Sequence, residues 1–318
     1  MSFATRALAG AAVSGLGAHR PSTHLDNALI AERIGSSDEW IRERSGIVTR
    51  GISDESVVDM GTSAAGKALA AAGVDPAALG LVLLATCSMP GPLPGGAPEI
   101  ASRLGAAAAG ASDIGAGCAG FAYALSLAAD TVRTGTAEHV LVIGSELLSP
   151  MVDPDDRGTA FLFGDGAGAV VVSRTTDERV GPVVWAHDGA QHDRLVIQGS
   201  PLRVAMEGRA IYRWATTSLP GLARRACAAA GIEVADLKAF VPHQANLRIT
   251  DSVVAALKLP EHVVVARDVI DSGNTSAASV PLAWARLQET GAIASGDPVL
   301  LLGFGAGLTA AGQVVLSP

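Results

Sequence analysis

The sequence predicts an α/β protein built from two similar halves, and three observations lead to this prediction. Short apolar runs alternate along the chain with helical segments rich in alanine, leucine and arginine. Segments of the second half repeat segments of the first at a nearly constant spacing. The chain has 318 residues, 49% of them apolar, which is enough for one large domain or two closely packed ones. We therefore expect halves spanning 1–173 and 174–318.

Apolar runs of strand length carry the alternation. Each is rich in valine, leucine or isoleucine and lies next to a helical segment, such as the Ala/Leu-rich stretch 122–132. A first strand is expected around 7–13, because that stretch is diluted by glycine and alanine and runs straight into Pro21, unlike a signal peptide. The other expected strands are 80–85, 140–143, 169–172, 239–241, 299–302 and 313–316.

The repeat supports the division into halves. One match in a chain rich in alanine and glycine carries little weight, but three matches at a shift of about 158 residues indicate a duplication. If the halves pack about a pseudo-twofold axis, equivalent strand ends converge on one central site. The three pairs are 70–75 with 228–233, 113–115 with 271–273, and 140–144 with 299–303.

Composition limits the partners and the compartment. A net charge of −8 argues against nucleic acid as a general partner. Cys87, Cys118 and Cys227 form neither a disulfide framework nor a C-x-x-C metal pair, so we expect no metal site and a reducing, cytoplasmic compartment. No apolar run approaches the roughly 18 residues that a transmembrane helix needs, so no membrane segment is expected.

Cys118 is the candidate nucleophile. It lies between a short strand-like segment and the helical stretch 122–132, and Gly117 and Gly120 leave room for a long substrate. A thiol at a helix N-terminus meets free N–H groups and the positive end of the helix dipole, which predicts a lowered pKa. Taken alone, Cys118 could equally be a small buried hydrophobic residue.

His243 and Asn274 are the candidate partners of Cys118. His243 follows the apolar strand 239–241, and Asn274 lies in a turn of small residues at 272–279. In the repeat, the turn carrying Asn274 in the second half corresponds to the turn carrying Cys118 in the first half. Taken singly, His243 could be bonded to backbone at a strand end, and Asn274 could be a helix N-cap. Taken together, the three residues predict one catalytic site.

Six motifs in chain order resemble the β-ketoacyl-acyl carrier protein synthase III family, which has the thiolase fold. The resemblance covers essentially the whole chain and implies two α/β halves stacked as αβαβα layers. The motifs are DEWI with SGI at 38–41 and 45–47, GCAGF at 117–121, DRGT with FGDGAG at 156–159 and 163–168, HQAN at 243–246, GNTS at 273–276, and FGAG at 304–307.

The resemblance implies a decarboxylating condensing enzyme without a cofactor. Cys118 would take an acyl group from acyl-CoA and pass it to malonyl-acyl carrier protein, giving a 3-oxoacyl thioester. Backbone N–H groups of Cys118 and Ala306 would hold the oxyanion, although the family usually has glycine at the latter position. His243 and Asn274 would donate hydrogen bonds to the enolate that decarboxylation leaves, and two neutral donors suit that charge.

Binding residues are also implied by the resemblance. The carrier protein is acidic, and one lysine, Lys258, stands where a basic pair is often found. Docking is therefore expected to be weaker or to be tuned to a particular carrier. Leu93 would reach across a homodimer interface and close the partner's acyl pocket. Because leucine is smaller than the aromatic residue of many acetyl-selective members, a longer or branched starter is expected to fit. The implied residues are Trp40, Arg44, Arg157, Gly208 and Asn246 for CoA, Arg213, Gln244 and Arg248 for the carrier protein, and Leu93, Leu162 and Phe163 for the acyl pocket.

The cysteine pattern also bears on alternative functions. A degradative thiolase would need a second cysteine near the C-terminus, and 228–318 contain none. A catalytically silent subunit would typically have lost Cys118. A starter-loading enzyme or acyltransferase of a polyketide or other secondary pathway would use the same three residues and stays open. The starter group and the pathway also stay open.

Overall fold

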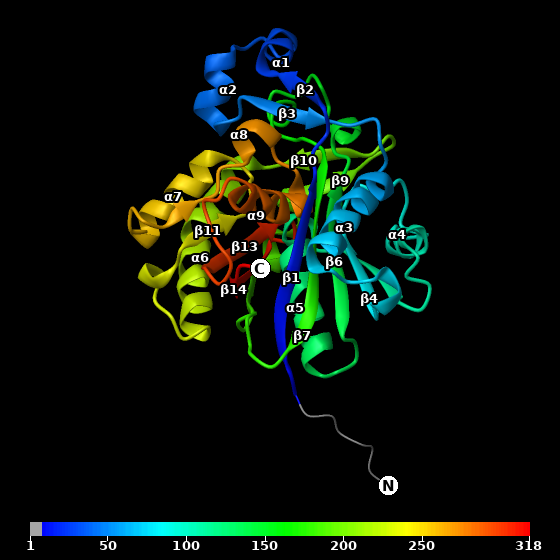
Figure 1. Cartoon of the computed structure of the whole chain (residues 1–318). Coiled ribbons are helices and arrows are strands. Elements are labelled where there is room, and N and C mark those ends of the chain that lie inside the picture. The colour runs from blue at the N-terminus through cyan, green and yellow to red at the C-terminus, as the bar shows by residue number, and fades with distance from the viewer. Residues whose placement is uncertain (1–7) are drawn as a thin grey trace.

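The computed structural model describes residues 8–318, and within them two mixed five-stranded sheets dominate the molecule (Figure 1). The strand orders are β1-β7-β6-β4-β5 and β8-β14-β13-β11-β12. Each sheet has two antiparallel pairs followed by two parallel pairs in that order. The two halves therefore build the same sheet twice, as the sequence repeat predicts.

The expected strands are present, and most extend beyond the apolar runs. The first sheet comprises β1 (Gly10–His19), β4 (Leu81–Ala85), β5 (Gly110–Ile114), β6 (His139–Glu146) and β7 (Gly166–Thr175). The second comprises β8 (Val184–His187), β11 (Ala239–Pro242), β12 (Val264–Val265), β13 (Pro298–Gly305) and β14 (Thr309–Leu316). The expected first strand begins later than predicted, and the part of 7–13 at residue 7 lies outside the described residues.

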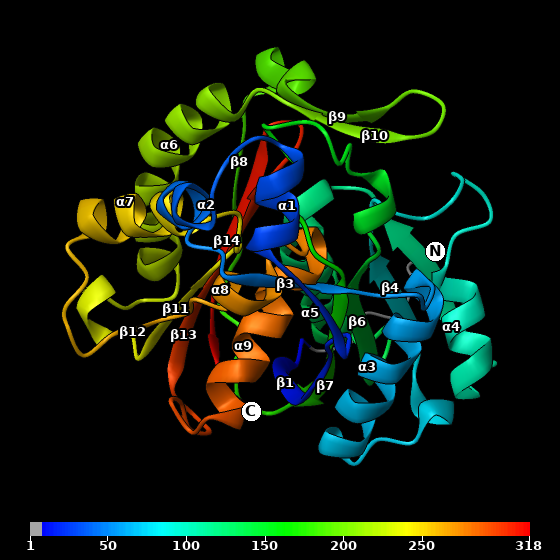
Figure 2. The ribbon, with the colours of Figure 1, turned by 90° about the horizontal axis from the view of Figure 1, so that it is seen from above.

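Helices form three layers around the two sheets. The helices α5 (Gly120–Arg133) and α9 (Ser279–Glu289) contact strands of both sheets and lie between them. The first sheet is covered by α3 (Val57–Ala72) and α4 (Ala97–Leu104). On the opposite side of the molecule, α6 (Gly208–Ala229) and α7 (Leu247–Leu257) cover the second sheet (Figure 2). This is the αβαβα layering that the resemblance implies.

Smaller elements gather at one end of the sheets (Figure 1). They include the only two-stranded sheets among residues 8–318, one of which pairs β2 with β3 and the other β9 with β10. The hairpin β9–β10 was not expected from the sequence. These elements are β2 (Thr23–Asp26), α1 (Asn27–Arg33), α2 (Asp38–Ser45), β3 (Thr49–Ile52), β9 (Leu195–Gln198), β10 (Arg203–Met206) and α8 (Val269–Ser272).

The repeated segments 70–75 and 228–233 follow the same path in the two halves. In each, a long helix ends and a glycine in the left-handed region turns the chain, with φ of 64° at Gly73 and 74° at Gly231. A short 3₁₀ helix follows, η1 (Pro76–Ala78) or η5 (Val234–Asp236), and leads into β4 or β11. The sequence match is therefore a structural equivalence.

The core between the sheets is continuous from one half to the other. It is built mainly from alanine and valine, and Val142 and Val172 of the first half pack in the same cluster as Val241 and Val299 of the second. Trp284 of α9 is its largest side chain and is fully buried. Small side chains let the central helices approach both sheets closely.

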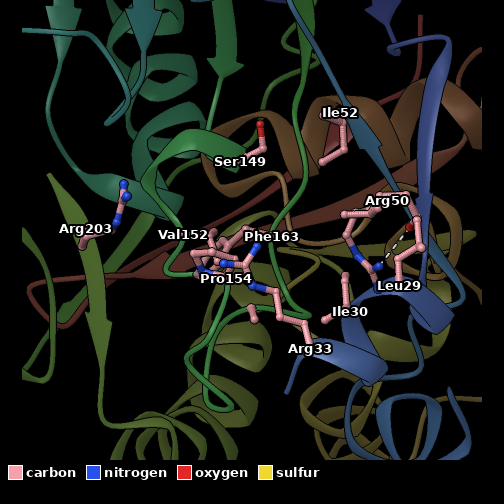
Figure 3. A pocket seen from close by; sticks show the side chains of 12 residues that line it. Leu29, Ile30, Arg33, Arg50, Ile52, Ser149, Val152, Pro154, Phe163 and Arg203 are labelled. Carbon is pink, nitrogen blue, oxygen red and sulfur yellow. Dashed lines mark hydrogen bonds between the residues drawn. The ribbon is translucent and has the colours of Figure 1, made fainter. Parts of the chain in front are cut away.

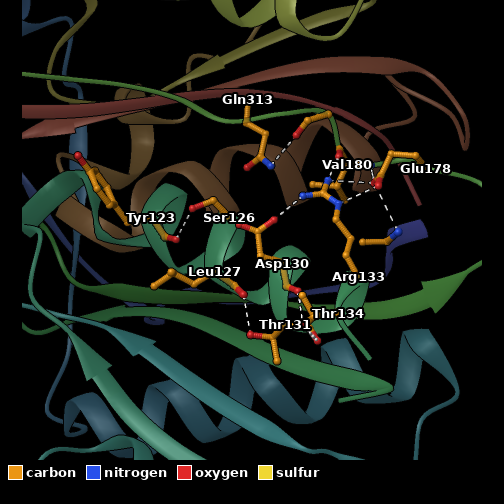
Figure 4. Close-up of polar contacts among 12 residues, drawn as sticks. Tyr123, Ser126, Leu127, Asp130, Thr131, Arg133, Thr134, Glu178, Val180 and Gln313 are labelled. Carbon is orange, nitrogen blue, oxygen red and sulfur yellow. Dashed lines mark hydrogen bonds and ion pairs between the residues drawn. The ribbon is translucent and has the colours of Figure 1, made fainter. Parts of the chain in front are cut away.

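The C-terminal end of α5 is held by an ion-pair group (Figure 4). Arg133 pairs with Asp130 at 2.7 Å and with Glu178 at 2.8 Å, and it also donates to the backbone carbonyl of Val180. A cation in the last turn of a helix is favourable to the helix dipole. These contacts tie α5, whose other end carries Cys118, to the segment that joins the halves.

The helices and the potential metal-binding side chains of residues 8–318 bear on possible partners. None of the helices there is long and apolar enough to cross a bilayer. No group of three or more His, Cys, Asp or Glu side chains in that part of the chain is arranged to hold a metal ion.

Candidate active site

Cys118 lies in a short 3₁₀ helix, η2 (Gly117–Ala119), which follows β5 and leads directly into α5. Gly117 begins this turn with φ of 50°, a left-handed conformation that glycine adopts without strain. The Cys118 side chain is buried and lines a cavity of about 60 Å³. The predicted position at a helix N-terminus is therefore confirmed.

The predicted lowering of the Cys118 pKa is wrong. Burial raises the pKa of the thiol to about 12, and the Glu146 carboxylate adds to the rise, against hydrogen bonds from Ser276 and from the backbone of Cys118 itself. Loss of solvation disfavours the charged thiolate more than nearby donors favour it. Cys118 is therefore a neutral thiol at neutral pH.

Gly305, at the end of β13, lies directly against Cys118. A Cβ atom at this position would stand 2.8 Å from Cys118 Cβ and 3.2 Å from its sulfur, so a larger side chain would displace the nucleophile. The next residue, Ala306, lines the same cavity and touches the turn at Gly117. The two backbone N–H groups expected to hold an oxyanion, those of Cys118 and Ala306, thus belong to adjoining segments.

His243 directly follows β11 and is buried. Its Nδ1 lies 2.6 Å from the hydroxyl of Ser279, which also accepts a hydrogen bond from the backbone N–H of Gln244 at 3.3 Å. Because the Ser279 oxygen accepts from Gln244, its own hydrogen can be donated to Nδ1. The neutral ring then carries its proton on Nε2.

Burial lowers the pKa of His243 from 6.5 to about 3, so the imidazole is neutral over the physiological range. Phe304 packs edge-on against the ring, with centroids 4.9 Å apart and planes at 73°. Since Phe304 contacts His243 and the next residue, Gly305, contacts Cys118, the end of β13 brings the histidine and the nucleophile together.

Asn274 is held by hydrogen bonds to the segment that carries Leu162 and Phe163, two of the residues predicted to line the acyl pocket. Its backbone N–H donates to the carbonyl of Leu162 at 2.8 Å, and its own carbonyl accepts from Gly164 at 3.1 Å. Its side-chain Oδ1 accepts from the backbone N–H of Ser276 at 2.9 Å. The amide oxygen is therefore engaged, which leaves the Nδ2 hydrogens as the donors available to a substrate.

The acyl-pocket residues predicted from sequence lie in three different settings. Phe163 lines the Cys118 cavity. Leu162 is buried in the neighbouring apolar cluster and contributes its backbone carbonyl rather than its side chain to the site. Leu93 is 86% exposed on the loop between β4 and α4, away from the cavity of its own chain. The other apolar walls come from Leu148, Leu195, Val196, Ile197 and Val204.

Phe163 also lines a second cavity, of about 400 Å³, which lies between α1, β3 and the segment after β6 (Figure 3). Three arginines border it. Arg33 pairs with Asp155 at 2.6 Å, Arg50 donates to the carbonyl of Leu25 at 2.9 Å, and Arg203 donates to a backbone carbonyl as well. None of the three predicted catalytic side chains lines this cavity.

The structure brings together the three residues expected at the nucleotide end of CoA. The guanidinium carbon of Arg157 lies 4.9 Å from the centre of the Trp40 ring, and that of Arg44 lies 5.5 Å from it. Phe161 holds the indole from the side, at 5.3 Å between ring centres. Both cations contact the indole directly, in cation–π geometry.

The residues expected along the tunnel and at the carrier-protein surface lie on α6 and α7. Gly208 begins α6, and Asn246 caps α7 by accepting from Ile249 N–H at 3.0 Å. Arg213 and Arg248 are exposed on these two adjoining helices. Gln244 departs from its expected role.

Gln244 is 1% exposed, and its amide group is bonded inside the protein. Nε2 donates to the carbonyls of Pro242 and Ala266, and Oε1 accepts from Val269 N–H. Such a side chain cannot face a carrier protein in this conformation. Instead, it links the backbone just before His243 to the backbone at 266–269.

Sequence reasoning missed several residues of the site. Ser276 and Ser279 both lie in the segment of small residues at 272–279 that carries Asn274. Nothing in that pattern distinguishes these two serines from the other small residues. Glu146 is fully buried at the end of β6 and accepts from the hydroxyl of Thr86 at 3.0 Å and the thiol of Cys87 at 3.3 Å. A carboxylate at the end of an otherwise apolar strand is the signal that could have drawn attention to it.

Comparison with known proteins establishes the family. The model of 3-oxoacyl-[acyl-carrier-protein (ACP)] synthase III matches residues 112–189, and the model of its C-terminal part matches 227–316. The chain belongs to the 3-oxoacyl-[acyl-carrier-protein] synthase III family. It is a condensing acyltransferase with the thiolase fold, and the family's activity implies acyl-CoA and acyl carrier protein as its substrates.

Individual relatives cover nearly the whole synthase. Beta-ketoacyl-[acyl-carrier-protein] synthase III 1 of Streptomyces coelicolor is 48% identical over 97% of this chain and 96% of its own length. The crystal structure of the priming β-ketosynthase from the R1128 polyketide biosynthetic pathway has a TM-score of 0.98 and 43% identity, covering 100% of this chain and 99% of that one. The synthase III of Aquifex aeolicus has a TM-score of 0.92 and 36% identity, covering 97% and 100%.

Proposed function

We propose that this synthase III begins acyl-chain synthesis in two steps on Cys118. In the first, the Cys118 sulfur attacks the carbonyl carbon of an acyl-CoA starter. A carbon–sulfur bond to Cys118 forms, the bond to the CoA sulfur breaks, and CoA leaves as the thiol with the proton that Cys118 gives up. The N–H groups of Cys118 and Ala306 hold the oxyanion of the tetrahedral intermediate.

In the second step, malonyl-acyl carrier protein replaces CoA. Its carboxylate leaves as CO₂, and the electron pair of the broken carbon–carbon bond forms an enolate on the thioester. Nε2–H of His243 and Nδ2–H of Asn274 donate to the enolate oxygen. The enolate carbon attacks the acyl carbonyl, and Cys118 leaves as a thiolate that takes a proton from solvent.

The observation that carries this proposal is the way the donors are left free. The hydroxyl of Ser279, which accepts from the backbone N–H of Gln244, occupies Nδ1 of His243, and the backbone N–H of Ser276 occupies Oδ1 of Asn274. Each side chain therefore keeps N–H hydrogens for a ligand and has its acceptor atom engaged. A neutral histidine supports the role as well, because it donates without needing acidic conditions.

Binding of CoA requires a movement of Arg157. A ring held between Trp40 and Arg157 needs roughly 7 Å, since each face contact takes roughly 3.5 Å. The present separation is 4.9 Å. We therefore propose that the guanidinium swings away from the indole and closes again on the adenine.

The starter and the pathway belong to the same proposal. The cavity wall is apolar, which favours an unfunctionalised acyl group over a charged one. Relatives include both synthase III enzymes and a priming ketosynthase of a polyketide pathway, so initiation of either kind of chain is supported. A starter-loading role without condensation would leave the free donors of His243 and Asn274 without a task.

We also propose that the synthase works as a homodimer in the cytoplasm and that its halves divide near residue 173. Among residues 8–318, the edge strand β5 leaves one side of the first sheet unpaired, and Leu93 is largely exposed. An exposed edge strand is a natural site for pairing with a second chain. Leu93 of each protomer would then close the pocket of its partner.

Intact-protein mass spectrometry tests the two-step proposal. Acyl-CoA alone should add one acyl group to the protein, and malonyl-acyl carrier protein should then remove it as a 3-oxoacyl product. Cys118→Ala should abolish the adduct, whereas Cys227→Ala, which removes a buried thiol of α6, should retain it. Acylation of the Cys118→Ala protein at another residue would overturn the assignment.

A further inference from the structure

Ser276 contributes the only hydroxyl side chain to the wall of the Cys118 cavity within the described part of the chain. It is 1% exposed, and its φ is 46°. Left-handed backbone is uncommon for residues other than glycine and is strained for a serine. Its place on the cavity wall raises the question of what the side chain does there.

The two halves of the synthase build the same turn in different ways. In the first half, Gly117 begins η2 with φ of 50°, and α5 starts at Gly120. In the second, Ser276 begins η6 (Ser276–Ala278) with φ of 46°, and α9 starts at Ser279. Glycine meets this geometry without cost, but the second half keeps a side chain at the equivalent position. Strain of this kind points to a functional side chain.

Ser276 lines the same cavity as two cysteines, Cys87 and Cys118. Its Oγ lies 3.6 Å from the sulfur of Cys87. The hydroxyl also favours the charged form of Cys118, because it lowers the pKa of that thiol against the larger effect of burial. The backbone N–H of Ser276 meanwhile orients Asn274, so one residue contacts both halves of the reaction machinery.

Glu146 determines which way the hydroxyl hydrogen can point. The Cys87 thiol donates to Glu146 Oε1 at 3.3 Å, so its hydrogen is already used. The titratable groups that face Ser276 are then Cys118 of η2, Cys87 after β4 and Glu146 at the end of β6. The Ser276 hydroxyl also lowers the pKa of the Glu146 carboxyl, so this carboxylate is one acceptor for it. On the cavity side, the acceptor is the Cys118 sulfur when it is negatively charged.

We propose that Ser276 is a further catalytic residue of this synthase, whose hydroxyl donates a hydrogen bond to the Cys118 sulfur whenever that sulfur carries negative charge. The inference rests on the proposed role of Cys118. Charge appears on the sulfur twice, when it attacks the starter thioester and when the enolate displaces it. Because a bond to a thiolate is stronger than one to a thiol or thioester, the hydroxyl favours the reacting states over the resting ones. Ser276 keeps its own proton throughout.

The test measures the reactivity of Cys118 directly. The second-order rate of Cys118 alkylation by iodoacetamide is followed against pH in the full-length protein, with the modified site mapped by peptide mass spectrometry. Ser276→Ala and Ser276→Gly should both shift the midpoint of this profile upward by about one pH unit, which slows alkylation about tenfold at a fixed pH below it. Loading from butyryl-CoA should slow in parallel.

Two comparisons separate the hydroxyl from the fold. Ser276→Gly suits the left-handed backbone, so an equal loss in the glycine and alanine variants assigns the effect to the missing hydroxyl. Thr275→Val is the matched control, because the Thr275 hydroxyl is buried next door and has no hydrogen-bond partner among residues 8–318. Its alkylation profile should match the wild type.

Unshifted profiles in both Ser276 variants, or an equal shift in Thr275→Val, would overturn the proposal. Alkylation needs no acyl-CoA, so it decides the role of Ser276 independently of the acyl-transfer reaction. If wild-type protein alkylates at Cys118 but is never acylated there, the proposed function fails instead. The two failures are therefore distinguishable.

Discussion

The hydroxyl of Ser279 lies 2.6 Å from Nδ1 of His243. Ser279 is the first residue of α9, the central helix of the second half, whereas His243 directly follows β11 of the same half. The helix that follows the Asn274 turn therefore also sets the proton position of the histidine. One local arrangement orients both donors to the enolate.

Ser279→Ala should impair condensation more than loading. Without the hydroxyl, nothing selects the tautomer with hydrogen on Nε2, and we expect condensation to slow by about tenfold or more, a fraction of the effect of losing a whole oxyanion donor. Steady-state rates with malonyl-acyl carrier protein and single-turnover loading by acyl-CoA measure the two steps. Nitrogen NMR of labelled histidine should show the tautomer change.

Ser126→Ala is the control for that variant. Ser126 is another buried serine, on α5, and its hydroxyl donates only to the backbone carbonyl of Tyr123 at 2.8 Å. Its condensation rate should stay near the wild-type value. Equal losses of condensation in the two variants would mean that Ser279 acts only through packing.

Asn274→Asp should load acyl groups but condense poorly. The carboxylate can still accept from Ser276 N–H, but it has no hydrogen to donate and it repels the enolate. We expect condensation to fall by roughly a hundredfold or more, as for the loss of one oxyanion donor. Mass spectrometry of loading and a coupled assay of 3-oxoacyl product measure the steps separately. Normal condensation would show that Asn274 serves only to shape the turn.

Leu93→Phe should narrow the choice of starter if Leu93 closes the partner's pocket. One methylene in an apolar pocket is worth about 1–3 kcal/mol, so the preference between starters could change by roughly ten- to two-hundredfold. The variant should favour acetyl-CoA over butyryl- or isobutyryl-CoA, judged by the ratio of kcat/KM values. An unchanged ratio would mean that chain length is set by the walls within one chain.

Gly305→Ala should disable loading. Its Cβ would meet the Cβ of Cys118 at 2.8 Å, so the nucleophile must move, and a displacement of about 1 Å can cost about a hundredfold in rate. Single-turnover acylation measures this loss. Gly221→Ala is the matched control, since its added Cβ would find only a side-chain atom of Arg225 at 3.7 Å. Similar loading by both variants would contradict the close approach at Gly305.

His243 should make the protein less stable in acid. Its pKa is about 3 when folded and about 6.5 when exposed, so below pH 6.5 the unfolded chain binds a proton that the folded chain does not. Stability is thus complete above pH 6.5 and is lost as the pH falls toward 3, by up to about 1.4 kcal/mol per pH unit.

Urea denaturation at pH 7 and pH 5 measures this effect. His243→Asn removes the titrating group, so the variant should lose less free energy of unfolding between the two pH values than the wild type. Other ionisable groups are common to both proteins and cancel in the comparison. Parallel losses would mean that His243 is accessible to protons in the folded state.

The sequence predicts the fold well because the repeated segments leave a local signal, and the same signal indicates where Cys118, His243 and Asn274 lie relative to the strands. Cys118, His243 and Asn274 each follow a strand or lie in a turn between apolar segments, and the halves repeat those segments. The hairpin β9–β10 leaves no such signal. It is short, and Leu195, Ile197 and Val204 face a cavity rather than a sheet.

Other parts of the site depend on depth and direction, which a sequence does not record. The sequence pattern predicts the position of Cys118 at a helix N-terminus, but it does not show the burial that raises the pKa of the thiol. Gln244 lies beside His243 in the chain, yet its side chain turns into the core. Ser276 and Ser279 look alike in sequence, and only their partners separate a hydroxyl near sulfur from one near imidazole.

The continuous core between the sheets also restricts how a substrate can arrive. Because Trp284 and valines of both halves pack as one cluster, separating the halves would expose the most deeply buried surface of the molecule to water. The two sheets therefore cannot separate from each other during each turnover. A thioester therefore has to reach the buried Cys118 while the two sheets stay packed together, which favours an acyl group carried on a slender arm.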